Sequence, residues 1–278
     1  MLNSFHSVVI ETPDLEVGLR EYAQLLGLPL PRIEVNAARK TRSGLFSLEN
    51  MRLELRTSEA GGAPTGEARI AGVRLAGPDS AAIDEALRAR ALRPASAQTE
   101  VFAEVESEAE RGVGREYRCL EMDRKRSRGL GIELISDEAP AFQPTEAGEA
   151  SVFGLDHVVV YSTAPDATRR FYEEDLGIRL ALDRTFEKRG VRLLFFRIGG
   201  ATLEIGGKLD APVKEDSVDR FGGLAWKVRE IDAIAARLAA AGVDVSEVRD
   251  GFKAGTRVCT VRDQTQGVPT LLIEPVKS

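Results

Sequence analysis

The second half of the chain resembles the first half in sequence. Residues 4–30, SFHSVVIETPDLEVGLREYAQLLGLPL, align with residues 154–180, GLDHVVVYSTAPDATRRFYEEDLGIRL. Residues 118–135, RCLEMDRKRSRGLGIELI, align with residues 258–275, VCTVRDQTQGVPTLLIEP. Internal similarity at so long a period indicates a duplication, so whatever one half folds into, the other half should fold into as well.

The two halves predict two domains. A chain of 278 residues is long enough for two domains of ordinary size. The segment between the repeats, SDEAPAFQPTEAGEAS, is rich in Pro, Ala and Glu and has no apolar periodicity, as is typical of a linker. We therefore predict a first domain over 1–136, a linker over 137–151 and a second domain over 152–278.

Each half divides again into two similar units. An apolar strand is followed by a helix and then by two or three further strands, so the pattern β-α-β-β-β occurs four times. The first helix is expected to begin near Asp14 and to end at the glycine of LLG. One face of that helix is apolar and carries Leu15, Leu19, Tyr22 and Leu26. The last helix shows the same spacing at Ile231, Ile234 and Leu238.

Four glutamates lie inside otherwise apolar strands: Glu54 in RLELR, Glu133 in GIELI, Glu204 in ATLEI and Glu274 in LLIEP. A carboxylate buried without a partner costs several kcal/mol, so each should be held by another group. The repeat alignment pairs Glu54 with Glu204, Glu133 with Glu274, and His6 with His157. Recurrence indicates an ancestral site, although duplication copies a residue whether or not it still works.

These segments resemble the vicinal-oxygen-chelate superfamily, which includes glyoxalase I, methylmalonyl-CoA epimerase, extradiol dioxygenases and antibiotic-resistance proteins. The likeness is carried by the strand DHVVV, the helix end YEEDLGIRL, the strand ATLEI and the closing GVPTLLIEP. It implies an α+β fold with two tandem domains. In each domain a pair of β-α-β-β-β units forms one curved mixed sheet with its helices outside.

The resemblance also implies where a metal would bind. In this superfamily the first strand often supplies a histidine and the last strand a glutamate. Carried onto this sequence, those positions are His157, Glu204 and Glu274 in the second half, and more weakly His6, Glu54 and Glu133 in the first. One divalent ion (Mn, Mg, Ni or Zn) is the implied cofactor, bound weakly or not at all.

The family's second histidine is missing. Its place falls near Gly223 in one half and Ile70 in the other, and the chain contains only two histidines. An extradiol dioxygenase needs two histidines and a carboxylate around its iron, so that activity is disfavoured.

Two classes of function remain open. The first is an isomerase, epimerase or lyase that moves a proton beside a carbonyl, with Glu204 or Glu274 as base and His157 as ligand or acid. A metal-free variant would use His157 alone. The second is a binding protein that sequesters a small molecule without chemistry. In either case Tyr161, Trp226 and Arg257 are candidates for the pocket wall, with ordinary core packing as the alternative for Tyr161 and Trp226.

Composition narrows the remaining classes. The net charge of −6 argues against binding to nucleic acid or to an anionic membrane. No apolar run approaches the length of a spanning helix, and two cysteines do not make a disulfide framework. We therefore expect a cytoplasmic protein with a small-molecule ligand, and either a monomer or a homodimer.

Overall fold

The structure is a computed structural model that describes residues 2–58, 67–77, 80–90, 92–104, 115–136, 144–146, 148–213 and 217–276. Residues 137–143 and 147 of the predicted linker lie outside the described residues. The chain passes from one sheet to the other between residues 136 and 152. The exact domain boundaries stay predictions.

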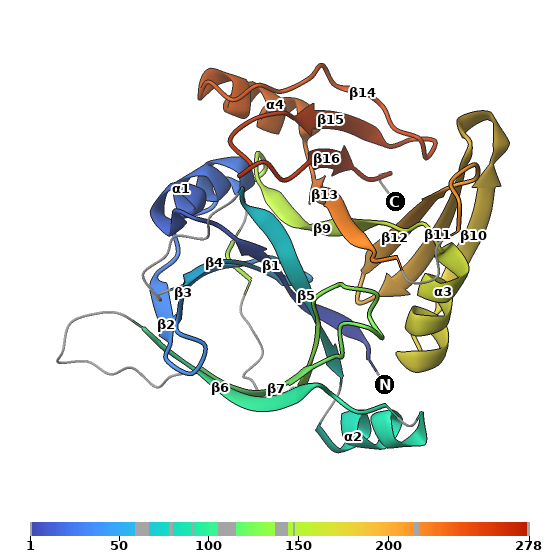
Figure 1. Ribbon diagram of the computed structural model, residues 1–278. Helices are drawn as coiled ribbons and strands as arrows, with labels where there is room; N and C mark the ends of the chain where they lie inside the picture. The colour runs from blue at the N-terminus through green and yellow to red at the C-terminus, as the bar shows by residue number, and fades with distance from the viewer. Residues whose placement is uncertain are drawn as a thin grey trace.

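The first half forms a closed barrel. Its elements are β1 (Ser4–Glu11), α1 (Leu15–Leu26), β2 (Ile33–Asn36), β3 (Thr41–Ser47), β4 (Arg52–Ser58), β5 (Arg69–Gly77), α2 (Ser80–Ala89), β6 (Ser96–Glu104), β7 (Arg115–Glu121) and β8 (Ile132–Ser136). The strands follow the order β1-β4-β3-β2-β6-β7-β8-β5, and β5 returns to pair with β1. Figure 1 looks into this ring of strands, with α1 and α2 outside it.

The second half forms an open, curled sheet. Its elements are β9 (Val152–Tyr161), α3 (Pro165–Arg170), the π-helix η1 (Phe171–Asp175), β10 (Leu180–Phe186), the 3₁₀-helix η2 (Glu187–Arg189), β11 (Val191–Ile198), β12 (Ala201–Lys208), β13 (Arg220–Val228), α4 (Ile231–Ala240), β14 (Arg249–Asp250), β15 (Arg257–Val261) and β16 (Thr270–Glu274). The order is β10-β11-β12-β9-β13-β16-β15-β14. The four predicted β-α-β-β-β units and the α+β class are thus confirmed.

The predicted helices begin and end where their caps require. The Asp14 side chain accepts a hydrogen bond of 2.9 Å from the backbone N–H of Val17, which satisfies one of the unpaired donors at the start of α1. Gly27 ends the helix in the left-handed conformation, with φ of 70°. The apolar face is buried as expected, and so is that of α4.

Side chains on the strands alternate between two environments. Toward the helices, every second residue of the central strands of the second sheet is buried: Val158, Val160, Leu203, Ile205, Leu224 and Trp226. The residues between them lie on the face turned away from α3 and α4, which we call the concave face. Successive side chains along a strand point to opposite faces of the sheet, so alternate residues share one environment.

Strand register changes the correspondence between the halves. Parallel pairing sets Ser7 opposite Arg52 and His157 opposite Thr202. Arg52 and Thr202 each precede the equivalent glutamate by two residues. Ser7, and not His6, is therefore the structural counterpart of His157. The sequence alignment of the two histidines is one residue out of step.

The last strands show a second difference. Arg74 on β5 and Ala225 on β13 take equivalent places, opposite Ser7 and His157. Their partners on the neighbouring strand are Glu133 on β8 and Leu271 on β16. Glu133 and Glu274 are consequently not equivalent, although the sequences around them align.

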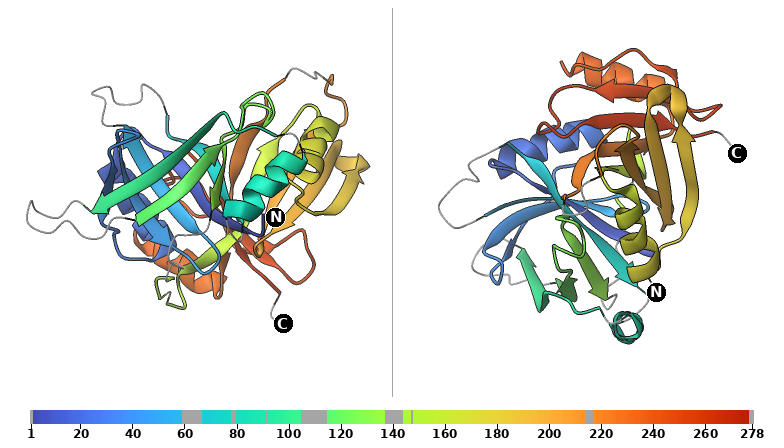
Figure 2. Two further views of the ribbon diagram at one scale, coloured as in Figure 1. Left: turned by 90° about the horizontal axis from the view of Figure 1, so that it is seen from below. Right: turned by 45° about the vertical axis from the view of Figure 1, so that its right-hand side comes forward.

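The two halves are joined through polar contacts as well as one continuous apolar core. The amide of Asn50 exchanges hydrogen bonds of 2.8 and 2.9 Å with the backbone of Leu155. The Tyr22 hydroxyl on α1 donates to the Thr265 carbonyl at 3.2 Å. Figures 1 and 2 show α1 lying against the C-terminal segments of the chain, while α2 lies beside α3.

Candidate functional site

His157 and Glu204 meet on the concave face of the second sheet. They project from the paired strands β9 and β12, and Nε2 of His157 lies 3.9 Å from Oε2 of Glu204. Their side chains keep 17% and 22% of their exposure, so both are shielded from water yet open to a ligand. Two of the three residues predicted for this half are therefore brought together.

A β-bulge adds a third member. Between Ala225 and Trp226 the pairing of β13 with β9 skips one residue, which leaves Asp156 unpaired beside His157. Such a bulge re-aims a side chain, here so that Oδ2 of Asp156 lies 2.8 Å from Nδ1 of His157. We call Asp156, His157 and Glu204 the His157 cluster.

The carboxyl groups of the cluster have opposite pKa shifts. Burial alone would raise the pKa of Asp156, but the hydrogen bond and charge of His157, with Lys227 and Arg197, outweigh it and hold that pKa below its ordinary value. Burial raises the pKa of Glu204, partly offset by His157. A carboxylate with a lowered pKa beside one with a raised pKa is the pattern of an acid–base site.

Glu274 lies elsewhere. It shares the helix-facing side of β16 with buried Leu272, and its Oε2 accepts a hydrogen bond of 3.0 Å from the backbone N–H of Ile231, at the start of α4. Nη1 of Arg257 lies 3.9 Å from the same oxygen. Glu274 thus caps helix α4 on the opposite face of the sheet from His157. The backbone N–H of Ile231 is the partner that a buried carboxylate requires, and no metal ion is needed for this.

The three predicted pocket residues also separate. Trp226 is fully buried in the core on the helix side. Arg257 forms a two-pronged ion pair with Asp232 at the surface, at 2.6 and 2.8 Å. Only Tyr161 lies on the concave face with His157, and it is 44% exposed beneath the guanidinium of Arg220. Trp226 therefore serves the packing of the core, and Arg257 serves an ion pair with helix α4.

In the first half a guanidinium stands between the two predicted carboxylate ligands. Arg74 on β5 is fully buried; its Nη1 is hydrogen-bonded to Glu54, and its Nε donates to Glu133 at 2.7 Å. Arg39 binds the other oxygen of Glu133 at 2.8 Å. Although burial alone would raise the pKa of Glu133, these arginines lower it to about 2. Both glutamates are therefore neutralised by cations of the chain itself.

His6 belongs to the same barrel interior. It is 7% exposed, and its Nε2 lies 3.4 Å from Nη1 of Arg52 while its Nδ1 lies 3.2 Å from Oγ of Ser7. A ring nitrogen shared with a guanidinium is poorly placed to bind a metal ion, because both would compete for the same lone pair.

The donor set does not fit the implied metal. Catalytic transition-metal sites are typically built from three protein ligands. The second half offers His157 and Glu204, while Ala225 and Leu271 occupy the neighbouring positions on β13 and β16. Across the described ranges, no three His, Cys, Asp or Glu side chains gather around a common point.

Sequence reasoning missed Asp156 and Arg74. Asp156 directly precedes His157, so a carboxylate-histidine pair could have been suspected from the sequence. Arg74 interrupts the apolar run AGVRLAG just as the glutamates interrupt theirs. A buried strand that carries an arginine should have been matched with the buried strands that carry glutamates.

Comparison with known proteins finds one family model that matches part of the chain and solved structures that share its fold. The sequence profile of the Glyoxalase/Bleomycin resistance protein/Dioxygenase superfamily matches residues 154–269. A mutant 4-hydroxymandelate synthase from Streptomyces coelicolor is 15% identical and superimposes with a TM-score of 0.69, covering 100% of this chain and 94% of its own. A Mn(II)-bound glyoxalase from Novosphingobium aromaticivorans is 16% identical with a TM-score of 0.65, covering 99% and 83%.

Another solved structure matches a smaller part of the chain. Methylmalonyl-CoA epimerase from Mycobacterium tuberculosis is 25% identical with a TM-score of 0.38, covering 45% of this chain and 90% of that one. No curated protein sequence matches the chain at a significant level. Within the described residues, no helix is long and apolar enough to cross a membrane.

Proposed function

Because residues 154–269 belong to the Glyoxalase/Bleomycin resistance protein/Dioxygenase superfamily, whose paired-unit fold the whole chain shares, we propose that this protein is a small-molecule enzyme that moves a proton beside a carbonyl. The reaction would take place on the concave face of the second sheet. One observation carries the proposal: His157 is bound at Nδ1 by Asp156 while its Nε2 faces Glu204.

The cluster can perform the transfer with its own groups. The Asp156 carboxylate accepts a hydrogen bond from Nδ1–H of His157, which favours the neutral tautomer with a lone pair on Nε2. Nε2 then removes the proton from the carbon next to the carbonyl, and the electron pair of that bond moves onto the carbonyl oxygen as an enolate. The proton returns to the same or a neighbouring carbon from His157 or from Glu204, whose raised pKa makes its acid form accessible.

Positive charge is available for the enolate. Arg197 on β11 lies in the same row across the sheet as Thr202 and His157, so its guanidinium shares the concave face. Lys227 lies near the same end of the face, where it interacts with Asp156 and Arg197. Cations placed where charge develops stabilise the intermediate in a partly desolvated site.

Exchange of hydrogen with solvent tests the proposal without knowledge of the natural substrate. Short 2-oxo acids and 2-methyl acyl thioesters would be incubated with the protein in D₂O, and loss of the α-proton followed by NMR. We expect exchange of at least one compound class, reduced about 10²–10⁴-fold in His157→Gln. Glu274→Gln, on the opposite face, is the matched control and should retain the wild-type rate. Exchange that persists in His157→Gln would contradict the proposed role.

Capture without chemistry is the second candidate. It is favoured by Ala225 and Leu271, which supply neither a metal ligand nor an acid–base group at the positions beside His157 on β13 and β16. If a compound binds with the same affinity to the wild type and to His157→Gln, and no compound exchanges hydrogen, a binding protein is the better account.

A further inference from the structure

Beside the His157 cluster, the concave face of the second sheet is apolar. On β10 and β11 every second residue turns to this face, and these residues pair across the two strands. Those that are apolar form what we call the apolar arm: Leu182, Phe186, Val191, Leu193 and Phe195. The arm is continuous with the cluster, because Phe195 lies directly opposite Glu204.

The apolar arm is open to solvent. Each of its residues keeps part of its side chain exposed, and Leu182 is 47% exposed. The residues that alternate with them on β11, such as Leu194 and Phe196, are fully buried on the helix side. A contiguous apolar surface that stays exposed in the folded chain is typical of a place that a ligand or partner covers.

The equivalent positions of the first half show the opposite arrangement. Strand register matches Phe186, Val191, Leu193 and Phe195 with Asn36, Thr41, Ser43 and Leu45. Most of these residues are polar, although Asn36 and Ser43 are fully buried in the closed barrel. The second half is thus apolar where its face is open, which the packing of a core does not require.

A contact between the two edges of the open sheet restricts what can reach the arm. The rings of Phe186 and Phe252 meet edge to face, with 5.1 Å between their centroids. Phe252 lies in the turn between β14 and β15, at the opposite edge of the sheet from β10, so the contact joins the two ends of the curl (Figure 1). A face bridged in this way admits a small molecule more readily than another folded chain.

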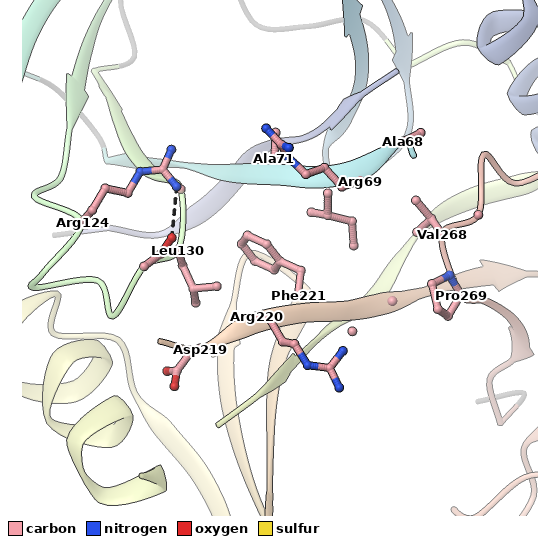
Figure 3. Close-up of a pocket in the computed structure, with 16 residues that line it drawn as sticks. Ala68, Arg69, Ala71, Arg124, Leu130, Asp219, Arg220, Phe221, Val268 and Pro269 are labelled. Atoms are coloured by element: carbon pink, nitrogen blue, oxygen red, sulfur yellow. Dashed lines mark hydrogen bonds between the residues drawn. The ribbon is translucent and has the colours of Figure 1, made fainter. Parts of the chain in front are cut away.

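The same face has space for a ligand above Gly206 on β12. This glycine lies between Leu193 and Tyr161, and a Cβ placed on it would meet their side chains at 3.5 and 3.8 Å, which are ordinary contact distances. Tyr161 is held in place by Arg220, which stacks on its ring at 4.5 Å. Figure 3 shows that the Arg220 side chain points away from Phe221, which is directed toward the first half.

We propose that the apolar arm binds the hydrophobic part of the substrate, so that the protein acts on a carbonyl compound with an alkyl group and not on a short polar one. This inference rests on the proposed function, which places the reacting carbonyl at the His157 cluster. The alkyl group extends from there over Phe195 and Gly206 toward Leu193. Removal of its CH₂ groups from water stabilises the complex.

A matched pair of unreactive probes tests the apolar arm. The full chain would be titrated calorimetrically with 3,3-dimethyl-2-oxobutanoate and with 3,3-dimethyl-2-oxoheptanoate. Both carry the same 2-oxo acid group, and neither has a proton on the carbon next to the carbonyl. We expect the longer probe to bind about tenfold more tightly, because its additional CH₂ groups lie on the arm. Equal affinities, or no binding of the longer probe at millimolar concentration, would overturn the proposal.

Two variants locate the alkyl group. Leu193→Ser gives β11 the residue that the first half carries at this position, and Gly206→Val fills the space beside it. In each variant the preference for the longer probe should fall below about threefold. Leu30→Ser makes the same substitution at an exposed leucine of the first half and should keep the preference of the wild type. A preference that survives in both Leu193→Ser and Gly206→Val would refute the assignment.

The proposed function and the apolar arm can fail separately. Because neither probe can lose a proton, their affinities do not depend on catalysis by the His157 cluster. A preserved preference for the longer probe, with hydrogen exchange in no compound, would refute proton transfer and support the arm as a binding site. Exchange without the preference would do the reverse. A dimer in sedimentation that dissociates in Leu193→Ser would show that a second copy covers the arm, which would also overturn the proposal.

Discussion

The behaviour of single carboxylates depends on what lies opposite them. Glu204 and Glu54 occupy equivalent positions on β12 and β4, yet one faces a histidine and the other a buried guanidinium. The first is left with a raised pKa, and the second is locked into an ion pair. One ancestral position has thus become a candidate catalytic group in one half and a structural group in the other.

The raised pKa of Glu204 predicts a gain of stability when the charge is removed. The folded protein holds this proton more tightly than the unfolded chain, whose glutamate has the ordinary pKa of 4.5. The free energy of unfolding therefore falls as pH rises from 4.5 through the folded pKa. Glu204→Gln should be more stable than the wild type at pH 7, and this difference should vanish below about pH 4.

Thermal unfolding across this pH range measures the effect. Glu247→Gln, which removes the same charge from an exposed side chain, should follow the wild type throughout. Parallel pH profiles for the wild type and Glu204→Gln would show that burial does not disfavour the charge. A Glu204→Gln variant that is more stable but transfers protons more slowly would indicate that the wild type keeps this buried carboxylate at a cost in stability.

Removal of Arg74 should destabilise the barrel strongly. Arg74→Met leaves Glu54 buried without its guanidinium and takes one of two cations from Glu133. Loss of one partner from a buried ion pair typically costs about 3–5 kcal/mol. Arg69→Met, on the same strand but 70% exposed beside Glu11, should cost less than about 1 kcal/mol.

Urea denaturation separates these outcomes through the midpoint at unchanged slope. Equal midpoints for Arg74→Met and Arg69→Met would mean that the buried network contributes no more than a surface pair. The network would then be a weak determinant of the barrel.

At the scale of elements, helix α4 depends on a strand for its cap. Glu230, at the N-cap position, makes no side-chain capping bond, and Glu274 of β16 supplies the acceptor to Ile231 instead. A negative charge at a helix N-terminus also favours the helix dipole. This contact joins α4 to the sheet it covers.

Glu274→Gln should therefore affect stability and not chemistry. The neutral amide still accepts a hydrogen bond but loses the charge, so we expect a loss of about 0.3–1 kcal/mol in the free energy of unfolding. The rate at which the variant exchanges the substrate α-proton with D₂O should equal that of the wild type. His157→Gln would be measured in the same experiment. A fall in rate as large as that of His157→Gln would return Glu274 to the active site.

Most of the helices and strands can be predicted from the sequence, but the strand bulge at Asp156 cannot. The duplication, the four units, the caps of α1 and the buried faces of the helices follow from apolar period and turn residues. The bulge at Asp156 does not, because the sequence does not show which residue the neighbouring strand leaves unpaired. The first half has a bulge at the equivalent place, where the pairing of β1 with β5 skips His6, so His6 corresponds to Asp156 and not to His157.

Partners across the sheet are also hidden from the sequence. Alternation shows that Glu54, Glu133, Glu204 and Glu274 are unusual, but it does not say what each one meets. Strand order and register decide that Arg74 lies between the first two, that His157 faces the third and that Ile231 takes the fourth. These pairings join residues from 20 to 59 positions apart within the first half.

At the scale of the whole molecule, one arginine of the second half closes a helix of the first. Arg237 on α4 donates to the carbonyls of Gln24 and Leu25 at the end of α1, and to that of Ala150 at 2.9 Å. These acceptors are among the last carbonyls of α1 and the chain segment that enters β9. A guanidinium at a helix C-terminus satisfies unpaired carbonyls and the helix dipole together.

Arg237→Met should loosen the coupling between the halves. Loss of charge-assisted hydrogen bonds to backbone acceptors should cost about 2–4 kcal/mol. Because the single tryptophan, Trp226, lies in the second half, its fluorescence reports that half alone, whereas far-ultraviolet circular dichroism reports both. We expect the two melting curves to coincide in the wild type and to separate in Arg237→Met.

The exposed pair of Arg262 and Asp244 supplies the control. Arg262→Met should melt as the wild type does by both probes, since this ion pair is half in solvent. Coincident curves and an unchanged midpoint in Arg237→Met would show that the apolar core alone holds the halves together.

The buried guanidinium of Arg74 has a consequence for how this barrel is assembled in a cell. A centre built around a bound ion is complete only when the surroundings provide that ion, and a chelator can strip it away. The positive charge between Glu54 and Glu133 is translated with the chain and cannot dissociate. The charges of Glu54 and Glu133 are therefore balanced within the first half as soon as the chain folds, whatever ions its surroundings hold.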